Sequence, residues 1–169
     1  IVGVGMTKFG VQPDKSSAEL ARNAVQSALA DAGASVADVG AAFYANTVGG
    51  AIEEQYGMKG QHALRAMGVQ GGPLFNIENA CAGGTSAFNL AVTQVGAGLT
   101  DVALAVGTEK MNTDDREKRA RSFGQRLVRY QPRYGQAQCC LHLAVGHRHL
   151  SPLQPLQFLN HAQHIGIVR

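Results

Sequence analysis

The chain has few cysteines and no long apolar run, and both shortages exclude classes of protein. Only three of the 169 residues are cysteine, Cys81, Cys139 and Cys140, and their spacing fits neither a zinc knuckle nor a disulfide framework. No apolar run approaches the roughly 18 residues that span a bilayer, and the N-terminus lacks a basic leader. We therefore expect a protein of a reducing, cytoplasmic compartment, with no membrane span and no metal site.

Acidic residues are missing from the last third of the chain, because no Asp or Glu follows Glu117. Residues 1–112 hold six basic and nine acidic side chains, whereas residues 113–169 hold nine basic and three acidic ones. The opposite net charges, −3 and +6, indicate two kinds of sequence. We divide the chain into a first domain, 1–117, and an atypical basic tail rich in His and Gln, 118–169, in which no amphipathic element is predicted.

Strands and helices alternate in the first domain. Apolar periodicity predicts strands over 1–4, 39–44, 73–77 and 102–107, and helices over 17–32, 61–67 and 85–95. Ser16 and Glu19 make a capping box before the first helix, and Gly33 ends it. The order predicts an α/β layered fold, a mostly parallel sheet with helices on both faces. Segment 85–95 is apolar on nearly every side, so we expect it to be buried.

Cys81 lies between a predicted strand and a predicted helix. Unpaired backbone N–H groups and the helix dipole stabilise a thiolate at such a position. Gly83 and Gly84 have no Cβ, so the backbone can turn sharply and a thioester can approach the sulfur. This geometry suits covalent acyl transfer. By position alone, an inert buried cysteine is an equal alternative.

Residues 76–87, NIENACAGGTSA, closely resemble the nucleophile motif of thiolases, especially the branch of sterol-carrier-protein and lipid-transfer thiolases. Three other segments agree in order and spacing. Residues 1–10 resemble that branch's opening strand, residues 60–65 the helix before the nucleophile, and residues 104–111 the strand and turn after it. The resemblance covers residues 1–111 and implies one half of the duplicated thiolase-like fold.

By this resemblance, Cys81 is the catalytic residue that takes an acyl group from acyl-CoA as a thioester, for thiolysis or Claisen condensation. It implies a coenzyme A thioester as substrate, no permanently bound cofactor, and a homodimer or a partner chain. The family also uses a histidine in a Gly-His-Pro setting and a second cysteine in a Cys-x-Gly setting. Gly146-His147-Arg148 and Cys139-Cys140-Leu141 match neither, so we expect this chain alone not to complete turnover.

Two alternatives stay open, one within the superfamily and one from another class. A ketoacyl-synthase relative also carries the tetrapeptide of residues 80–83, and a catalytically silent thiolase-like subunit would serve to pair with a partner chain. Glu109-Lys110-Met111 and the opening residues favour the thiolase branch. We expect His62 to lie on a helix surface and Glu109 and Lys110 to shape a turn, and assign none of them a catalytic role.

The tail has three interpretations. The first is sequence not native to the family, produced by a shifted reading frame or a truncated gene. The second is an arm that binds nucleic acid, because basic and aromatic residues are interspersed: arginines at 116, 119, 121, 126, 129 and 133, and aromatic residues at 123, 130 and 134. Charge runs are usually solvated, so we do not expect a nucleic-acid partner. The third is metal binding by His142, His147 and His149, which no carboxylate or suitably placed cysteine completes.

Overall fold

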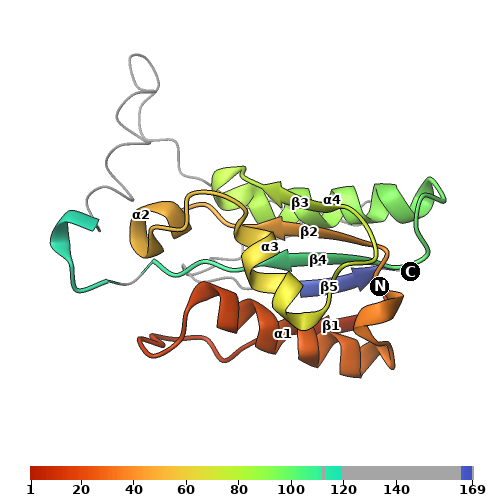
Figure 1. The fold of residues 1–169 in the computed structure, drawn as a ribbon, viewed down its shortest axis with the longest axis horizontal. Helices are drawn as coiled ribbons and strands as arrows, with labels where there is room; N and C mark the ends of the chain where they lie inside the picture. Colours follow the sequence, from red (N-terminus) through yellow and green to blue (C-terminus); the bar gives the residue numbers. More distant parts are fainter. Residues whose placement is uncertain (112, 119–164, 169) are drawn as a thin grey trace, which may run out of the picture.

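The computed structural model describes residues 1–111, 113–118 and 165–168, which form a five-stranded mixed sheet with helices on both faces (Figure 1). The sheet has the order β1-β5-β4-β2-β3. Its strands are β1 (Gly3–Gly5), β2 (Ala41–Ala45), β3 (Leu74–Ile77), β4 (Ala103–Gly107) and β5 (Ile165–Val168). The helices are α1 (Ser17–Ala32), α2 (Gly49–Glu53), α3 (Lys59–Leu64) and α4 (Gly83–Gly96), with 3-10 turns η1 (Val36–Asp38), η2 (Arg65–Met67) and η3 (Ala80–Ala82).

Strand β2 lies between two parallel neighbours, as expected for a mostly parallel sheet. It pairs with β3 on one side and with β4 on the other. Strand β5 is antiparallel to both β4 and β1, so it joins β1 to the rest of the sheet. The chain leaves β3, crosses β2 through α4 and returns as β4, which places the predicted helix 85–95 on one face of the sheet.

The two faces of the sheet carry different cores. On one face, α1 and α3 pack against β2, β4 and β5 around Leu64, Leu104 and Ile167, which are fully buried. On the other face, α4 packs on β2 and β4 through the small side chains of Ala87 and Ala91. The expected three-layer arrangement is therefore confirmed.

Helix α1 begins and ends where its sequence predicts. The Ser16 side chain accepts a hydrogen bond from the Glu19 N–H (3.2 Å), and the Glu19 carboxylate accepts one from the Ser16 N–H (2.8 Å). Gly33 ends the helix in the left-handed conformation, at φ 61°. The missing side chain of Gly5 allows β1 to lie close to α1, because a Cβ on Gly5 would lie 2.1 Å from the carbonyl oxygen of Ala24.

The predictions made from the sequence were wrong about three of the elements. Helix α4 is not buried: only Gly83, Ala87 and Ala91 are, and Leu90 is 43% exposed, because in the described residues a single sheet face covers the helix. Helix α2 was missed, because no element was predicted between residues 44 and 61 and its two glycines disfavour a helix. Strand β5 lies in the tail, where no element was predicted, because four residues are too few to show a period.

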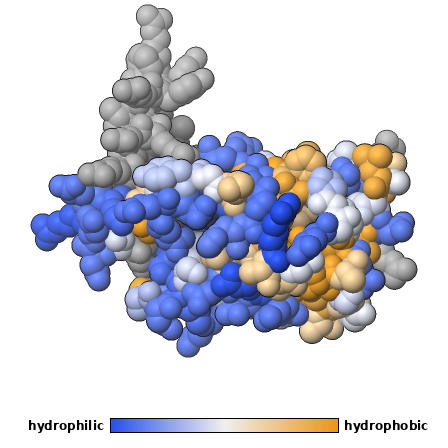
Figure 2. Space-filling model, viewed as in Figure 1, coloured by the Kyte–Doolittle hydropathy of each residue, from blue (hydrophilic) through white to orange (hydrophobic). Residues whose placement is uncertain are grey.

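Apolar surface gathers, in this view, toward the end of the sheet where β1 begins and β5 ends (Figures 1 and 2). The opposite end of the molecule is hydrophilic in the same view. Among the described residues no helix combines the length and the apolar character that a membrane crossing needs.

Candidate active site

The carboxyl ends of three parallel strands meet at one edge of the sheet. Ala45 at the end of β2 is in register with Ile77 of β3 and Gly107 of β4. The segments that follow, 46–48, 78–81 and 108–110, therefore leave the sheet together. Ligands of open α/β sheets bind in the crevice outside these ends, so this edge is the candidate site.

Cys81 lies at this edge, in the middle of turn η3, and the chain continues from η3 directly into α4. The residue is exposed. It lies two residues before Gly83, the first residue of the 14-residue helix α4, and the partial positive charge of the helix N-terminus favours an anion there. The structure thus places Cys81 at a helix N-terminus at the end of β3, where the sequence predicted it.

The sharp backbone turn before Cys81 is made by an alanine and not by the glycines. Ala80 has φ +43°, in the left-handed region that costs a non-glycine residue roughly 1 kcal/mol or more. Gly83 is helical, at φ −55° and ψ −47°. Its missing Cβ serves packing instead, since a Cβ there would lie 3.4 Å from the Cβ of Ala45 on β2. The expectation that the glycines make the turn was wrong.

Side chains from three segments hold the turn around Cys81. The Ala80 N–H donates to the Glu78 carboxylate (3.0 Å), and the Ala80 carbonyl accepts from the Thr47 hydroxyl (3.3 Å). The Asn79 side-chain amide donates to the Ser86 hydroxyl on α4 (2.9 Å). The strained conformation is therefore restrained on both sides of the Ala80 peptide.

Glu109, at the end of β4, binds the segment that follows β2. One carboxylate oxygen accepts from the Thr47 N–H (2.8 Å), and the other from the Val48 N–H (2.9 Å) and the Asn46 side-chain amide (3.3 Å). Burial raises the pKa of Glu109 above the usual carboxyl value, and the Val48 and Thr47 N–H groups oppose that rise. Glu109 thus shapes a turn, as expected, and does so by anchoring a second strand end.

Two buried polar side chains support the same edge from the α1 face. The Asn46 amide donates to the Thr108 carbonyl (2.8 Å) and accepts from the Gly49 N–H (2.9 Å). The Tyr44 hydroxyl lies 2.6 Å from the Thr108 hydroxyl, and burial raises the pKa of Tyr44 to about 12. Because their hydrogen bonds are satisfied inside the protein, these groups stiffen the ends of β2 and β4.

The nucleophile motif also contacts the helix before it. The Asn76 side chain on β3 accepts from the Gly60 N–H (2.7 Å) and donates to the Gln61 side chain (2.8 Å), near the start of α3. His62 is exposed on this helix, as predicted. The Lys110 ammonium donates to the carbonyls of Pro13 and Lys15, so this side chain too stabilises backbone structure.

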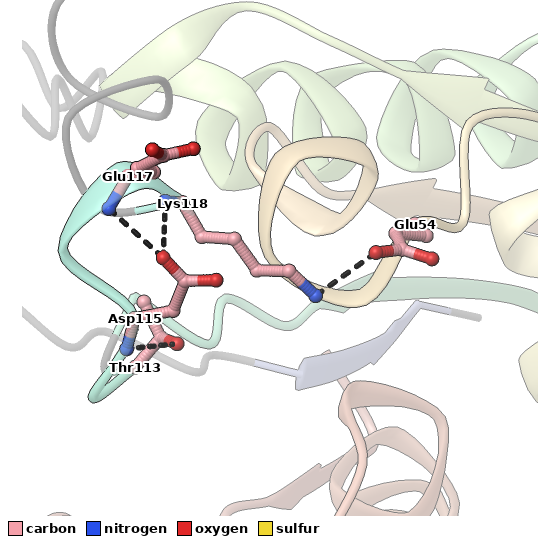
Figure 3. Close-up of polar contacts among 5 residues, drawn as sticks. All are labelled: Glu54, Thr113, Asp115, Glu117 and Lys118. Carbon is pink, nitrogen blue, oxygen red and sulfur yellow. Dashed lines mark hydrogen bonds and ion pairs between the residues drawn. The ribbon is translucent and has the colours of Figure 1, made fainter.

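After β4 the chain turns back toward α2 (Figure 3). Asp115 accepts from the N–H groups of Glu117 (2.9 Å) and Lys118 (3.1 Å), and Thr113 accepts from the Asp115 N–H (3.2 Å). Lys118 then pairs with Glu54 at 2.9 Å, and this hydrogen bond raises the pKa of Lys118. Such an exposed ion pair adds little to stability.

The remaining candidates of the sequence analysis lie outside the described residues. They are the Cys139-Cys140 pair, the histidines at 142, 147 and 149, and the arginines beyond 118. Thr47 was not singled out by the sequence, because no local pattern marks a residue that contacts another segment 33 positions away. Only the pairing of β2 with β3 brings it to the Cys81 turn.

The sheet order and the cysteine at the helix N-terminus define a thiolase-like fold. The structure is similar to that of 3-oxoacyl-[acyl-carrier-protein] synthase III from Aquifex aeolicus VF5, with a TM-score of 0.55 and 19% identity over 68% of this chain and 38% of that chain. At this identity the likeness shows the fold alone. The sequence matches the family described as "Thiolase, N-terminal domain" over residues 1–141. The chain belongs to the thiolase family, and the match runs past Glu117 into the segment assigned to the tail.

Curated relatives agree with this family. The chain is 36% identical over 131 residues to "Non-specific lipid-transfer protein-like 2" of Caenorhabditis elegans, covering 76% of this chain and 30% of that protein. It is 33% identical over 111 residues to "Acetyl-CoA acetyltransferase" of Methanothermobacter thermautotrophicus, covering 66% of this chain and 29% of that protein. The chain thus spans less than a third of the length of these relatives.

Proposed function

We propose that Cys81 is the nucleophile of a thiolase-type acyltransferase and that its substrate is an acyl-CoA. The observation that carries the proposal is the place of Cys81: it is exposed, on a strained turn at the N-terminus of α4, where the ends of β2, β3 and β4 meet. Strained backbone that the surroundings hold in place is a mark of functional sites. An inert core cysteine would instead be buried.

In the proposed reaction, the Cys81 thiolate attacks the carbonyl carbon of the acyl-CoA thioester. A new carbon–sulfur bond forms to Cys81, the bond between that carbon and the coenzyme A sulfur breaks, and coenzyme A leaves as a thiolate that takes up a proton. The dipole of α4 stabilises the attacking anion. Gly84 leaves room for the acyl group, because a Cβ on it would have no described atom within 4 Å.

The second half-reaction needs an acid and a base. The sequence contains neither the Gly-His-Pro setting nor a second cysteine in a Cys-x-Gly setting, so the proposal for this chain is formation of the acyl-enzyme. Thiolysis or Claisen condensation would follow when those groups are supplied. The name of the Methanothermobacter relative supports a coenzyme A thioester as the acyl donor. The donor and the reactive thiol fit a reducing, cytoplasmic compartment.

The test is intact-mass analysis after incubation with acetyl-CoA. We expect a mass increase equal to one acetyl group, lost in Cys81→Ser and kept in the matched control Cys139→Ser/Cys140→Ser. If folded wild-type protein forms no adduct, the proposal fails and the silent-subunit alternative is supported. If only an acyl group on an acyl carrier protein is accepted, the ketoacyl-synthase alternative is supported instead.

A second part of the proposal concerns the partner, which we take to be another copy of this chain. Strand β3 forms an edge of the sheet, and Phe75 on β3 and Leu90 and Val92 on α4 are 42–43% exposed. Exposed strand edges and apolar patches favour association. Light scattering should therefore detect a dimer that Leu90→Glu weakens and that the control Gln26→Glu on α1 does not. A wild-type monomer at all concentrations would refute this part.

A further inference from the structure

We infer that Thr47 is a positioning residue for Cys81 and that Glu109 holds Thr47 in place. This inference deepens the proposed function, since it rests on Cys81 being the nucleophile. Thr47 follows β2 and Glu109 follows β4, and their hydrogen bonds lead to the backbone of Ala80, the residue before the nucleophile.

The first step is the contact of Thr47 with the turn. The Thr47 hydroxyl donates to the carbonyl of Ala80, the residue directly before Cys81 (3.3 Å). Ala80 is one of three non-glycine residues with positive φ among those described, and its conformation persists only if neighbouring groups hold it. The peptide that joins Ala80 to Cys81 is thus oriented by a side chain from the end of β2.

The second step is the anchoring of Thr47 itself. Its N–H donates to one oxygen of Glu109 (2.8 Å), while the other oxygen accepts from the Val48 N–H (2.9 Å). Glu109 follows Thr108, whose N–H donates to the Ala45 carbonyl (3.1 Å). A continuous series of contacts therefore runs from the end of β4 through Glu109 and Thr47 to the Ala80 carbonyl.

The consequence concerns the direction of the Cys81 sulfur. The N-terminus of α4 stabilises the thiolate only if the sulfur lies close to it, and attack requires that the sulfur reach the thioester carbonyl carbon from above its plane. Small errors in position slow such reactions strongly. Without the Thr47 hydroxyl, the Ala80 peptide can rotate out of its strained conformation. We expect the protein to stay folded while the nucleophile loses its alignment.

The experiment compares Thr47→Val, which keeps the shape but removes the hydroxyl, with Thr47→Ser, which keeps the hydroxyl. The matched control is Thr93→Val on α4, because the Thr93 hydroxyl donates to the Asn89 carbonyl within its own helix (2.8 Å). Two rates are measured: acetylation of Cys81 by acetyl-CoA, and its alkylation by iodoacetamide as a function of pH. Denaturation curves establish that each variant is folded under the assay conditions.

Thr47→Val should acetylate about 2- to 10-fold more slowly, the factor expected for one lost hydrogen bond. Its alkylation profile should move to higher pH, since the sulfur is less well aligned with the helix dipole. Thr47→Ser and Thr93→Val should match the wild type, and Glu109→Gln should resemble Thr47→Val. If Thr47→Val fails to fold, Thr47→Ala replaces it.

Equal acetylation and alkylation in Thr47→Val and the wild type would overturn the inference, as would a Thr47→Ser variant as slow as Thr47→Val. Failure of the proposed function gives a different result, since the wild type itself would not be acetylated by acetyl-CoA. Alkylation by iodoacetamide needs no acyl donor, so in that case it still decides whether Thr47 positions the sulfur.

Discussion

Strand β5 should contribute a large part of the stability of this domain, and Ile167 is the residue that tests it. Its side chain is fully buried between α1 and the sheet, and its backbone is paired with Gly3 of β1 and Leu104 of β4. Replacing a buried isoleucine with alanine costs about 2–5 kcal/mol. We expect the upper part of this range, because β5 alone joins β1 to the described sheet. Such a loss is a large share of the roughly 5–15 kcal/mol of a typical domain.

The assay is equilibrium unfolding in urea, followed by circular dichroism, of the full chain. Ile167→Val should lose about 0.5–1.5 kcal/mol, so the two variants form a graded pair. Ile1→Ala is the control, since Ile1 is 70% exposed and exposed substitutions stay within about 0.5 kcal/mol. If Ile167→Ala also stays within that limit, β5 is not docked in the sheet, and the end of the chain does not belong to the domain.

Three further predictions concern β1, the start of α1 and the buried carboxylate. Gly5→Ala should destabilise by about 1–3 kcal/mol in thermal unfolding, because its Cβ would meet the backbone of α1, whereas Gly57→Ala meets nothing described within 4 Å. Ser16→Ala should cost about 0.5–2 kcal/mol through loss of the capping box, and exposed Ser27→Ala much less; equal effects would refute the capping argument. Burial raises the pKa of Glu109 above 4.5, so folding favours the protonated carboxyl group. The stability of the wild type should therefore fall, relative to that of Glu109→Gln, as the pH rises from 4.5 through the raised pKa. If the urea midpoints of the wild type and Glu109→Gln change by the same amount with pH, this prediction is wrong.

Local signals in the sequence were enough to predict the elements whose ends are marked by capping or stop residues. The capping box at Ser16 and the stop at Gly33 predicted α1 as it is observed. The apolar run before Gly107 predicted β4 to within one residue. For α3 the prediction began two residues late, because Lys59 and Gly60 give no helix signal and the Asn76 side chain on β3 receives the Gly60 N–H.

Burial was harder to predict than helicity. The sequence of α4 is apolar on nearly every side, which is typical of a buried helix. In the described residues only the side formed by Gly83, Ala87 and Ala91 lies against the sheet. The composition of a helix shows how much apolar surface it could bury, but it does not show whether another element is present to cover that surface.

The sequence by itself determined that this chain is an α/β protein with a thiolase nucleophile motif around Cys81, because periodicity, caps and a contiguous motif are local properties of a chain. Tertiary structure alone decided which residues surround Cys81. Parallel pairing of β2 with β3 brings Thr47, 34 positions before Cys81, to the turn, and pairing of β2 with β4 brings Glu109, 28 positions after Cys81, to Thr47. It also decided that residues 165–168 complete the sheet. Contacts of this kind depend on strand order and register, which no local pattern encodes.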